Sequence, residues 1–244
     1  QQKPDTIIIL GNSYETFLTA VAASLNNVPI AHIQGGESDF RTWDDSYGYG
    51  ITKLSHLHFT TTGKYRQQVI RFGEHSERVF NVGSLLLEKI KANPLKKETQ
   101  FLKEFGFQEK NPFIFISFHP DASLGSKNRQ IFQELINSLT DDRLTSFQLL
   151  FNKPEPRGLG KMIIQMIDEF TLNNAGRAIS LSSMDLPDTS RAIKNCVAMV
   201  GNSSEAIIIA PSFKTPVVNV GPRLRDRTKA KNIIECHAEK DEII

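Results

Sequence analysis

The sequence is poor in cysteine and has no long apolar run. Its two cysteines are Cys196 and Cys236, and Cys196 begins an apolar run. We therefore interpret Cys196 as a small hydrophobic residue, not as half of a disulfide or a metal ligand. No apolar run approaches the roughly 20 residues that cross a bilayer, and residues 1–5 contain no signal-peptide core. A cytoplasmic protein is the default expectation.

The sequence also lacks an excess of charge of one sign. It carries 29 Lys and Arg against 27 Asp and Glu, which gives a net charge of +2. Such a balance argues against the basic face that nucleic-acid binding needs. Hydrophobic content of 39% and charged content of 23% are typical of a globular protein with a core. The 244 residues suffice for one large α/β domain or two small ones.

The first half of the chain alternates between apolar strands and amphipathic helices. Residues 6–10 and 29–33 are apolar runs that end in glycine, which predicts two buried strands. Residues 15–26 place apolar side chains on one helical face between them, so the three segments predict a β–α–β unit with parallel strands. Further strands are expected at 57–60 and 78–83. We expect helices at 49–54 and 65–72, the first of them after a polar loop over 38–45.

The second half repeats the alternation after a charge-rich segment. We expect strands at 112–118, 147–151, 178–181 and 197–200, and helices at 128–139, 159–170 and 190–194. The sequence thus predicts an α/β fold with a partial first domain over 1–92, a linker over 93–110 and a nucleotide-binding domain over 111–244. Two such halves predict a cleft at the carboxyl ends of their strands. The abrupt start on a strand and the trailing last helix suggest the middle of a larger protein.

The stretch from Cys196 to Arg227 predicts a phosphate site. A buried strand ends at Gly201, and Ser203 and Ser204 open a helix whose free backbone N–H groups suit an anion. Arginines at 223, 225 and 227 follow the next strand and offer bidentate partners for a phosphate. The alternative is an ordinary strand–turn–helix, in which Ser203 is an N-cap and the basic loop is solvated.

Polar side chains that follow the predicted strands form a second set of candidates. Asn12, Glu37 and the pair Asp44 and Asp45 follow strands of the first half, and His119 follows a strand of the second. Side chains in these positions point toward the ligand edge of parallel sheets, where carboxylates and a histidine supply general acid–base chemistry. The competing interpretation of each acid is a helix cap or a solvated loop charge.

The other histidines of the first half are interpreted as structural residues and not as metal ligands. His32 lies inside an apolar strand, where a hydrogen-bonded core role is expected. His56 and His58 lie two residues apart, but no cysteine lies nearby and no third ligand stands at a fixed spacing, so we reject a zinc site. The sequence contains no Gly-x-Gly-x-x-Gly, Walker or Gly-x-Ser-x-Gly motif.

Several short stretches in a fixed order resemble one family. They include Pro-Ile-Ala-His-Ile-Gln-Gly-Gly-Glu at 29–37, Phe-His-Pro at 118–120 and Gly-Asn-Ser-Ser at 201–204, and the others are 44–46, 50–59, 78–83, 210–213 and 219–221. From about residue 5 to 236, the chain resembles the UDP-N-acetylglucosamine 2-epimerases, most nearly their hydrolysing branch used for sialic and related nonulosonic acids. The family folds as two Rossmann-like domains of the glycosyltransferase-B type. Its own N-terminal strands and C-terminal helices have no counterpart in these residues.

The resemblance implies a reaction and a set of site residues. The family eliminates UDP from UDP-N-acetylglucosamine to give a glycal and then adds water, which yields N-acetylmannosamine, without a redox cofactor or a metal. It implies that Glu37 and Asp45 move protons, that Asn12 stands at an aspartate position, and that His119 lies near the leaving UDP. The residues implied for UDP binding are Gly201, Ser203, Ser204, Arg223 and Arg227. The implied assembly is a homodimer or tetramer, and the implied partner is a UDP-sugar, with no nucleic acid and no membrane.

The chain departs from the family pattern around these positions. Asn12 stands where the family has an aspartate, and an amide is no general base at neutral pH. Glu205 adds a negative charge to the phosphate turn. The other departures are Ser13, Gly48 with Tyr49, Ala206, and Ile209, which stands where the family holds the ribose with a glutamate.

These departures leave three functions open. The first is a hydrolysing UDP-N-acetylglucosamine 2-epimerase, acting on that sugar or on a diamino-trideoxy analogue. The second is a catalytically impaired relative that binds a nucleotide sugar or a partner. The third is a glycosyltransferase of the same architecture, against which the Gly35-Gly36-Glu37 and Asp44-Asp45 arrangement argues.

Overall fold

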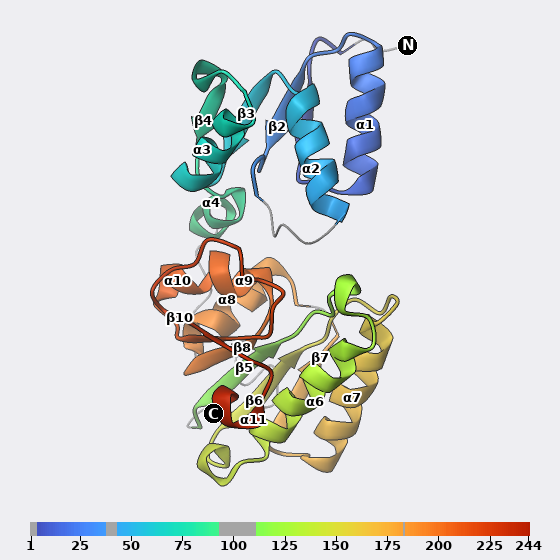
Figure 1. The fold of residues 1–244 in the computed structure, drawn as a ribbon. Helices are drawn as coiled ribbons and strands as arrows, with labels where there is room; N and C mark the ends of the chain where they lie inside the picture. The colour runs from blue at the N-terminus through green and yellow to red at the C-terminus, as the bar shows by residue number, and fades with distance from the viewer. Residues whose placement is uncertain (1–3, 38–42, 93–110, 183) are drawn as a thin grey trace. The chain divides into compact units, whose positions relative to one another are not determined.

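The computed structural model describes residues 4–37, 43–92, 111–182 and 184–244 (Figure 1). The chain divides into two compact units. Unit 1 comprises Gln1–Leu85 and Asp226–Thr228, and unit 2 comprises Leu86–Arg225 and Lys229–Ile244. Each unit has its own sheet, and all strand pairs in both sheets are parallel, which confirms the predicted α/β class. The predicted linker over 93–110 and the loop over 38–42 lie outside the described residues.

Unit 1 is a four-stranded sheet with its helices on one side. Its elements are β1 (Ile7–Leu10), α1 (Tyr14–Leu25), β2 (Ile30–Ile33), α2 (Trp43–Leu54), β3 (Leu57–Thr60), α3 (Gly63–Arg71) and β4 (Val79–Asn81). The strands follow the order β1-β2-β3-β4, so each crossover moves in the same direction. Because such crossovers are right-handed, all three helices cover the same face (Figure 1).

The two faces of this sheet differ in exposure. Ile9, Ile30 and Val79 are buried on the face that the helices cover, as are His32 and His58. The residues between them point to the opposite face and leave apolar surface in water: Ile8 (69% exposed), Leu10 (52%), Leu57 (40%) and Phe80 (45%). The rings of Phe59 and Phe80 stack there, with their centroids 5.6 Å apart. Among the described residues of unit 1, the sheet and its helices thus form two layers, and the sheet face opposite the helices carries exposed apolar side chains.

Unit 2 is a six-stranded sheet covered on both faces. Its elements are α4 (Leu85–Ala92), β5 (Phe113–Ser117), α6 (Lys127–Leu139), β6 (Gln148–Asn152), α7 (Gly160–Asn173), β7 (Ala178–Leu181), α8 (Leu186–Asn195), β8 (Ala198–Gly201), α9 (Ser204–Ile208), α10 (Ala210–Phe213), β9 (Val217–Val220), β10 (Ile233–Cys236) and α11 (Lys240–Ile243). The strand order is β10-β9-β8-β5-β6-β7. The chain therefore runs outward from β5 to β7 and returns to β8 on the other side of β5, which makes the β5–β8 junction the topological switch point.

The core of unit 2 lies on both sides of its sheet. The ribbons of α6 and α7 lie over one face of the sheet, and those of α8, α9 and α10 lie over the other (Figure 1). Their buried apolar side chains form one core cluster with the central strands on each face. All five residues of β5 and of β6 are buried. Burial on both faces explains why these strands are almost continuously apolar in sequence. None of the helices in the described parts of the chain has the length and apolar character of a membrane span.

Two elements differ from the prediction. The helix expected at 49–54 begins at Trp43, so Asp44 and Asp45 lie in the first turn of α2 and not in a loop. The prediction started this helix too late because Gly48 and Gly50 lower the helix propensity of the segment. The acidic residues before them are favourable at a helix N-terminus and were the signal for the earlier start. Gly50 is needed because a Cβ there would lie 2.6 Å from the Phe17 ring of α1. The edge strand β10 was not predicted, because four residues with a central glutamate give a weak strand pattern.

A matched pair of leucine substitutions tests the location of the core. Leu149 on β6 is 0% exposed and Leu172 on α7 is 79% exposed. We expect Leu149→Ala to lower the free energy of unfolding by about 2–5 kcal/mol, because it removes buried contacts and leaves a cavity. Leu172→Ala should change it by no more than about 0.5 kcal/mol. Chemical denaturation measures both, and equal effects would contradict the described core.

Candidate functional site

The switch point of unit 2 depends on a glycine. Gly201 ends β8 with a φ of 140°, a conformation that L side chains rarely adopt. A Cβ at this position would lie 2.1 Å from the carbonyl oxygen of Ser117 at the end of β5. Only glycine therefore lets the carboxyl ends of β5 and β8 approach this closely.

Asn202 joins the two strand ends directly. Its side-chain oxygen accepts from the backbone N–H of His119 at 2.7 Å, and its side-chain nitrogen donates to the carbonyl of His119 at 3.0 Å. Its own N–H donates to the carbonyl of Ser117 at 3.1 Å. Nη1 of Arg223 donates to the carbonyl of Asn202 at 2.6 Å, which brings the arginine that follows β9 to the same edge. His119, Asn202 and Arg223 thus form one cluster at the ligand edge of the sheet.

His119 is neutral at physiological pH. Burial and the nearby positive charge of Arg223 lower the pKa of its imidazole to about 4. Its Nε2 lies 3.5 Å from the hydroxyl oxygen of Ser117. A neutral imidazole has one N–H donor and one acceptor nitrogen. His119 can therefore donate a hydrogen bond to a ligand while the imidazole itself carries no charge.

Ser203 caps the short helix α9, as the alternative interpretation of this turn predicted. Its hydroxyl oxygen accepts from the N–H of Glu205 at 3.4 Å, and its hydroxyl donates to Oε2 of Glu205 at 2.9 Å. Burial raises the pKa of Glu205. Ser204 is the first residue of α9, while Ile209 is 0% exposed and packs in the core. A side chain at 209 therefore serves packing in this chain.

In unit 1, His32 connects the end of β1 to α2. Its Nε2 lies 3.0 Å from the carbonyl oxygen of Gly11, and its Nδ1 lies 3.3 Å from the hydroxyl oxygen of Thr52. Because a carbonyl only accepts, Nε2 carries the proton in the neutral ring, and Nδ1 is unprotonated. The hydroxyl of Thr52 has one proton, for which Nδ1 competes with the carbonyl oxygen of Gly48 at 2.9 Å. Burial lowers the pKa of His32 to about 4, which keeps the ring neutral. The core role predicted for His32 is confirmed.

This connection positions Asn12 next to α2. Asn12 follows Gly11, and a Cβ at Gly48 would lie 3.1 Å from the Cβ of Asn12. Asp45 lies three residues before Gly48 on the same helix and is buried. Asn12 and Asp45 thus belong to one corner of unit 1, between the end of β1 and the start of α2. The side chain of Asp44 lies outside the described residues.

Glu37 is engaged by two side chains of unit 1. Nη2 of Arg227 donates to its Oε2 at 2.7 Å, and the hydroxyl of Thr61 donates to its Oε1 at 2.5 Å. The segment that carries Arg227 is held further by the N–H of Thr228, which lies 3.3 Å from the hydroxyl oxygen of Tyr65. Arg227, which the sequence assigned to phosphate binding, therefore pairs with the predicted catalytic carboxylate, whereas Arg223 lies at the switch point.

Gln34 is a candidate that the sequence reasoning missed. It follows β2 with a φ of 68°, a left-handed conformation that is uncommon for a residue other than glycine. Its N–H donates to the carbonyl of Phe59 at 2.8 Å, which holds the strained backbone in place. Such strain at a strand end is a sign of a functional position. The signal in the sequence was a polar residue directly before Gly35 and Gly36, at the end of an apolar strand.

The predicted residues fall into two groups. Unit 1 holds Asn12, Glu37, Asp45 and Arg227, and unit 2 holds His119, Gly201, Ser203, Ser204 and Arg223. In the described parts of the chain, no group of three or more His, Cys, Asp or Glu residues is arranged to hold a metal ion. Nδ1 of His56 accepts from the N–H of Ile30 at 3.3 Å, and Nε2 of His58 lies 3.3 Å from Oε2 of Glu74.

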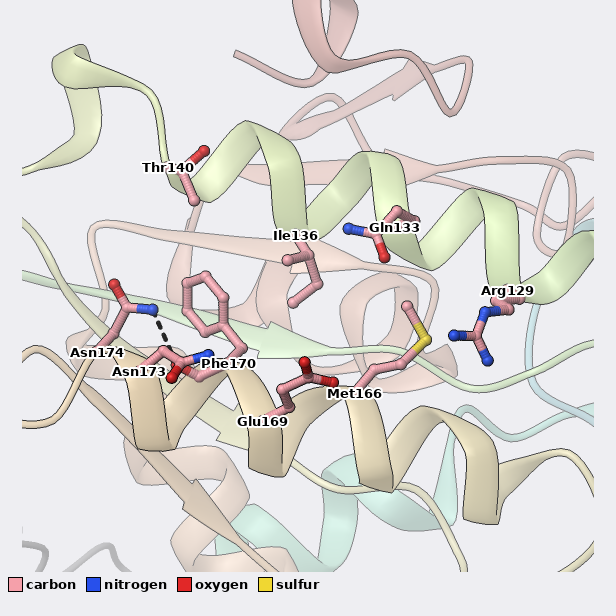
Figure 2. A pocket seen from close by; sticks show the side chains of 9 residues that line it. All are labelled: Arg129, Gln133, Ile136, Thr140, Met166, Glu169, Phe170, Asn173 and Asn174. Atoms are coloured by element: carbon pink, nitrogen blue, oxygen red, sulfur yellow. Dashed lines mark hydrogen bonds between the residues drawn. The ribbon is translucent and has the colours of Figure 1, made fainter.

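A separate groove lies between α6 and α7 (Figure 2). Its volume is about 210 Å³, and its lining residues come from α6, α7 and the residue that follows each of these helices. Figure 2 shows Ile136 of α6 and Met166 and Phe170 of α7 pointing into the space between the two helices. The side-chain amide of Asn174 donates to the carbonyl of Phe170 at 2.8 Å. None of the predicted site residues lines this groove.

Parallel sheets with helices between successive strands, and a strand order that reverses at the β5–β8 junction, define a Rossmann-like α/β class of fold. The family model described as UDP-N-acetylglucosamine 2-epimerase matches residues 1–244. The chain therefore belongs to the UDP-N-acetylglucosamine 2-epimerase family, which confirms the resemblance seen in the sequence.

Similarity to individual proteins supports this family assignment. The chain is 32% identical to the GDP/UDP-N,N'-diacetylbacillosamine 2-epimerase (hydrolyzing) of Campylobacter jejuni, a match that covers 96% of the chain and 60% of that protein. It is 31% identical to the UDP-N,N'-diacetylbacillosamine 2-epimerase (hydrolyzing) of Legionella pneumophila, over 100% of the chain and 63% of that protein. The chain thus spans about 60% of the length of these curated relatives. A solved structure described as the S. aureus MnaA-UDP co-structure is similar with a TM-score of 0.79 at 20% identity, over 98% of the chain and 64% of the solved one, which shows the same fold.

The buried imidazole of His32 predicts a pH dependence of stability. Its pKa falls from an ordinary 6.5 to about 4 on folding, so the unfolded chain takes up a proton first as the pH drops. The stability that His32 contributes is complete above its unfolded pKa and is lost as the pH falls toward its folded pKa. Between about pH 7.5 and about pH 5, we expect a loss of about 2 kcal/mol from this residue.

Denaturation of the wild type and of His32→Gln at both pH values measures this contribution. Glutamine keeps a donor for the Gly11 carbonyl and does not titrate, so the variant should lose about 2 kcal/mol less than the wild type on acidification. The same loss in both proteins would show that His32 takes up its proton without destabilising the fold.

Proposed function

We propose that the protein containing this chain is a hydrolysing UDP-N-acetylglucosamine 2-epimerase. Water and a UDP-linked 2-acetamido sugar would give UDP and the sugar epimerised at C2, which is N-acetylmannosamine when the substrate is UDP-N-acetylglucosamine. The observation that carries the proposal is the similarity of nearly the whole chain to relatives whose names describe hydrolysing 2-epimerases. The same family membership supports a homo-oligomeric assembly and a cytoplasmic location, which we propose with it.

The proposed reaction has two steps, each of which needs proton transfer. In the first, a base removes the proton at C2 while the bond between C1 and the diphosphate oxygen breaks, so UDP leaves and a glycal remains. In the second, water adds its hydroxyl to C1 and a proton returns to C2 from the other face. Asp45 and Glu37 are the carboxylates of unit 1 that we assign to these transfers, because Glu37 lies just after the carboxyl end of β2 and Asp45 lies in the first turn of α2, the helix that follows β2.

Unit 2 would bind the nucleotide at its switch point. Ligands of doubly wound sheets bind outside the carboxyl ends of the strands where the strand order reverses, which is the junction of β5 and β8. Arg223 supplies positive charge there, and Ser203 and Ser204 supply hydroxyls. His119 is neutral at this edge, so it can donate a hydrogen bond to the leaving UDP.

The names of the curated relatives support a class of sugar substrate. Both of those described above are named for N,N'-diacetylbacillosamine, a diamino-trideoxy sugar. Each candidate carries an acetamido group at C2, beside the proton that the reaction removes. We therefore propose UDP-linked 2-acetamido sugars as the substrate class, with UDP-N-acetylglucosamine and the diacetylated sugar as the two members to compare.

One observation favours a second candidate, a nucleotide-sugar binding protein without turnover. Asn12 places an amide at the end of β1, where a carboxylate would supply a base. Both carboxylate oxygens of Glu37 are engaged, one by Arg227 and one by Thr61. A protein with these features would retain the nucleotide site of unit 2 and lose proton transfer.

Release of UDP from UDP-N-acetylglucosamine distinguishes the two candidates. We expect the full-length protein to release UDP and form N-acetylmannosamine, and Asp45→Asn to lower the rate by about 100-fold or more because an amide does not accept the proton. Asp5→Asn changes an exposed aspartate of unit 1 and should leave the rate unchanged.

A coupled assay for UDP with chromatography of the sugar product provides the measurement. Micromolar binding of UDP in calorimetry without release from either UDP-sugar would favour the second candidate. Equal rates for Asp45→Asn and Asp5→Asn would remove Asp45 from the mechanism.

A further inference from the structure

Glu205 occupies an unusual place for an anion. It lies in the first turn of α9, next to the switch point of unit 2, where the proposed function places the diphosphate. Its side chain is only partly exposed, and its Oε2 accepts the hydroxyl proton of Ser203 at 2.9 Å. The carboxylate of Glu205 therefore already accepts the Ser203 hydroxyl proton that a bound phosphate would need.

The hydrogen bonds of Ser203 limit what this turn can do. A serine hydroxyl has one proton to donate, and here the proton goes to Glu205. The hydroxyl oxygen accepts from the N–H of Glu205 at 3.4 Å, so both hydrogen bonds of the Ser203 side chain are made with Glu205 in the first turn of α9. To donate to a phosphate oxygen, Ser203 must release the carboxylate, which would leave two anions facing each other in a partly buried place.

Protonation of Glu205 removes both obstacles. A carboxylic acid carries no charge to repel the diphosphate, no longer needs the Ser203 proton, and has an O–H of its own to donate to a phosphate oxygen. We propose that Glu205 takes up one proton from solvent when a nucleoside diphosphate binds at the Ser203 turn, so that the protein binds UDP more tightly as the pH falls. This inference rests on the proposed function, because it assumes that the nucleotide binds at this edge.

The surroundings of Glu205 support proton uptake by this residue. Burial raises its pKa already without a ligand, while the hydrogen bond from Ser203 opposes that effect. The pKa of His119 is about 4, so His119 stays neutral across the useful pH range, and Arg223 stays charged. α10, which packs against α9, carries no titratable side chain over Ala210–Phe213. The charged side chains of α8, which packs against α10, are Asp188, Arg191 and Lys194.

The linkage has a definite sign and size. A bound diphosphate raises the pKa of Glu205 further, since a nearby anion disfavours the carboxylate. Affinity then rises as the pH falls through the pKa of the complex and levels off below the pKa of the free protein. Within this window, each pH unit changes the dissociation constant by up to about tenfold, and up to about one proton is taken up for each nucleotide.

Calorimetric titration with UDP tests the proposal. The full-length wild type and Glu205→Gln are compared from about pH 5.5 to 8.5, with Glu169→Gln, an exposed glutamate of unit 2, as the matched control. At about pH 8 free UDP is fully ionised, because a terminal phosphate loses its second proton near pH 6. Proton uptake in buffers of different ionisation enthalpy then reports on the protein alone.

We expect the wild type and Glu169→Gln to take up a proton at about pH 8 and to bind UDP progressively more weakly as the pH rises. Glu205→Gln should take up none, and at about pH 8 it should bind UDP at least about tenfold more tightly than the wild type, because its amide is neutral and donates. Proton uptake in the wild type does not depend on the folding of any variant.

Two results would overturn the proposal and are distinguishable. UDP binding with the same pH dependence in the wild type and Glu205→Gln, without proton uptake, would reject the role of Glu205 and leave the nucleotide site intact. Absence of UDP binding to all three proteins at every pH would reject the nucleotide site itself, and the role of Glu205 with it.

Discussion

The hydrogen bonds between Asn202 and the backbone of His119 are the interaction on which the candidate nucleotide site depends. They join the carboxyl ends of β5 and β8 through two residues that are 83 positions apart along the chain. The glycine before Asn202 lets the strands come close enough for these bonds to form. Arg223 reinforces it from the next strand through the carbonyl of Asn202.

Unit 1 uses a buried side chain for a comparable purpose. His32 lies within β2 and ties the backbone after β1 to α2 through Gly11 and Thr52. The strand end that carries Asn12 and the helix that carries Asp45 are therefore held by one neutral ring. In both units, a polar side chain of a strand or strand end thus fixes the local geometry through hydrogen bonds to the backbone of another segment.

The sequence predicted best what depends on local pattern. Strands such as Phe113–Ser117 are buried on both faces, so their apolar runs predicted their position. The start of α2 was missed because Gly48 and Gly50 serve contacts with Asn12 and Phe17, which no local pattern reveals. The pairing of Arg227 with Glu37 spans 190 residues and reflects how the chain folds back, so its sequence neighbourhood suggested a phosphate partner. Glu205 was visible as an added charge, but its bond to Ser203 required coordinates.

The exposed face of the unit 1 sheet has a practical consequence. Ile8, Leu10 and Phe80 expose apolar side chains on β1 and β4, and β1 is an edge strand among the strands that the structure describes. Contiguous apolar surface next to an edge strand, whose outer backbone N–H and C=O groups can pair with another chain, promotes aggregation. A recombinant fragment trimmed to residues 4–85 would therefore tend to precipitate on concentration, and a lysine in place of Ile8 is the simplest way to keep it dispersed.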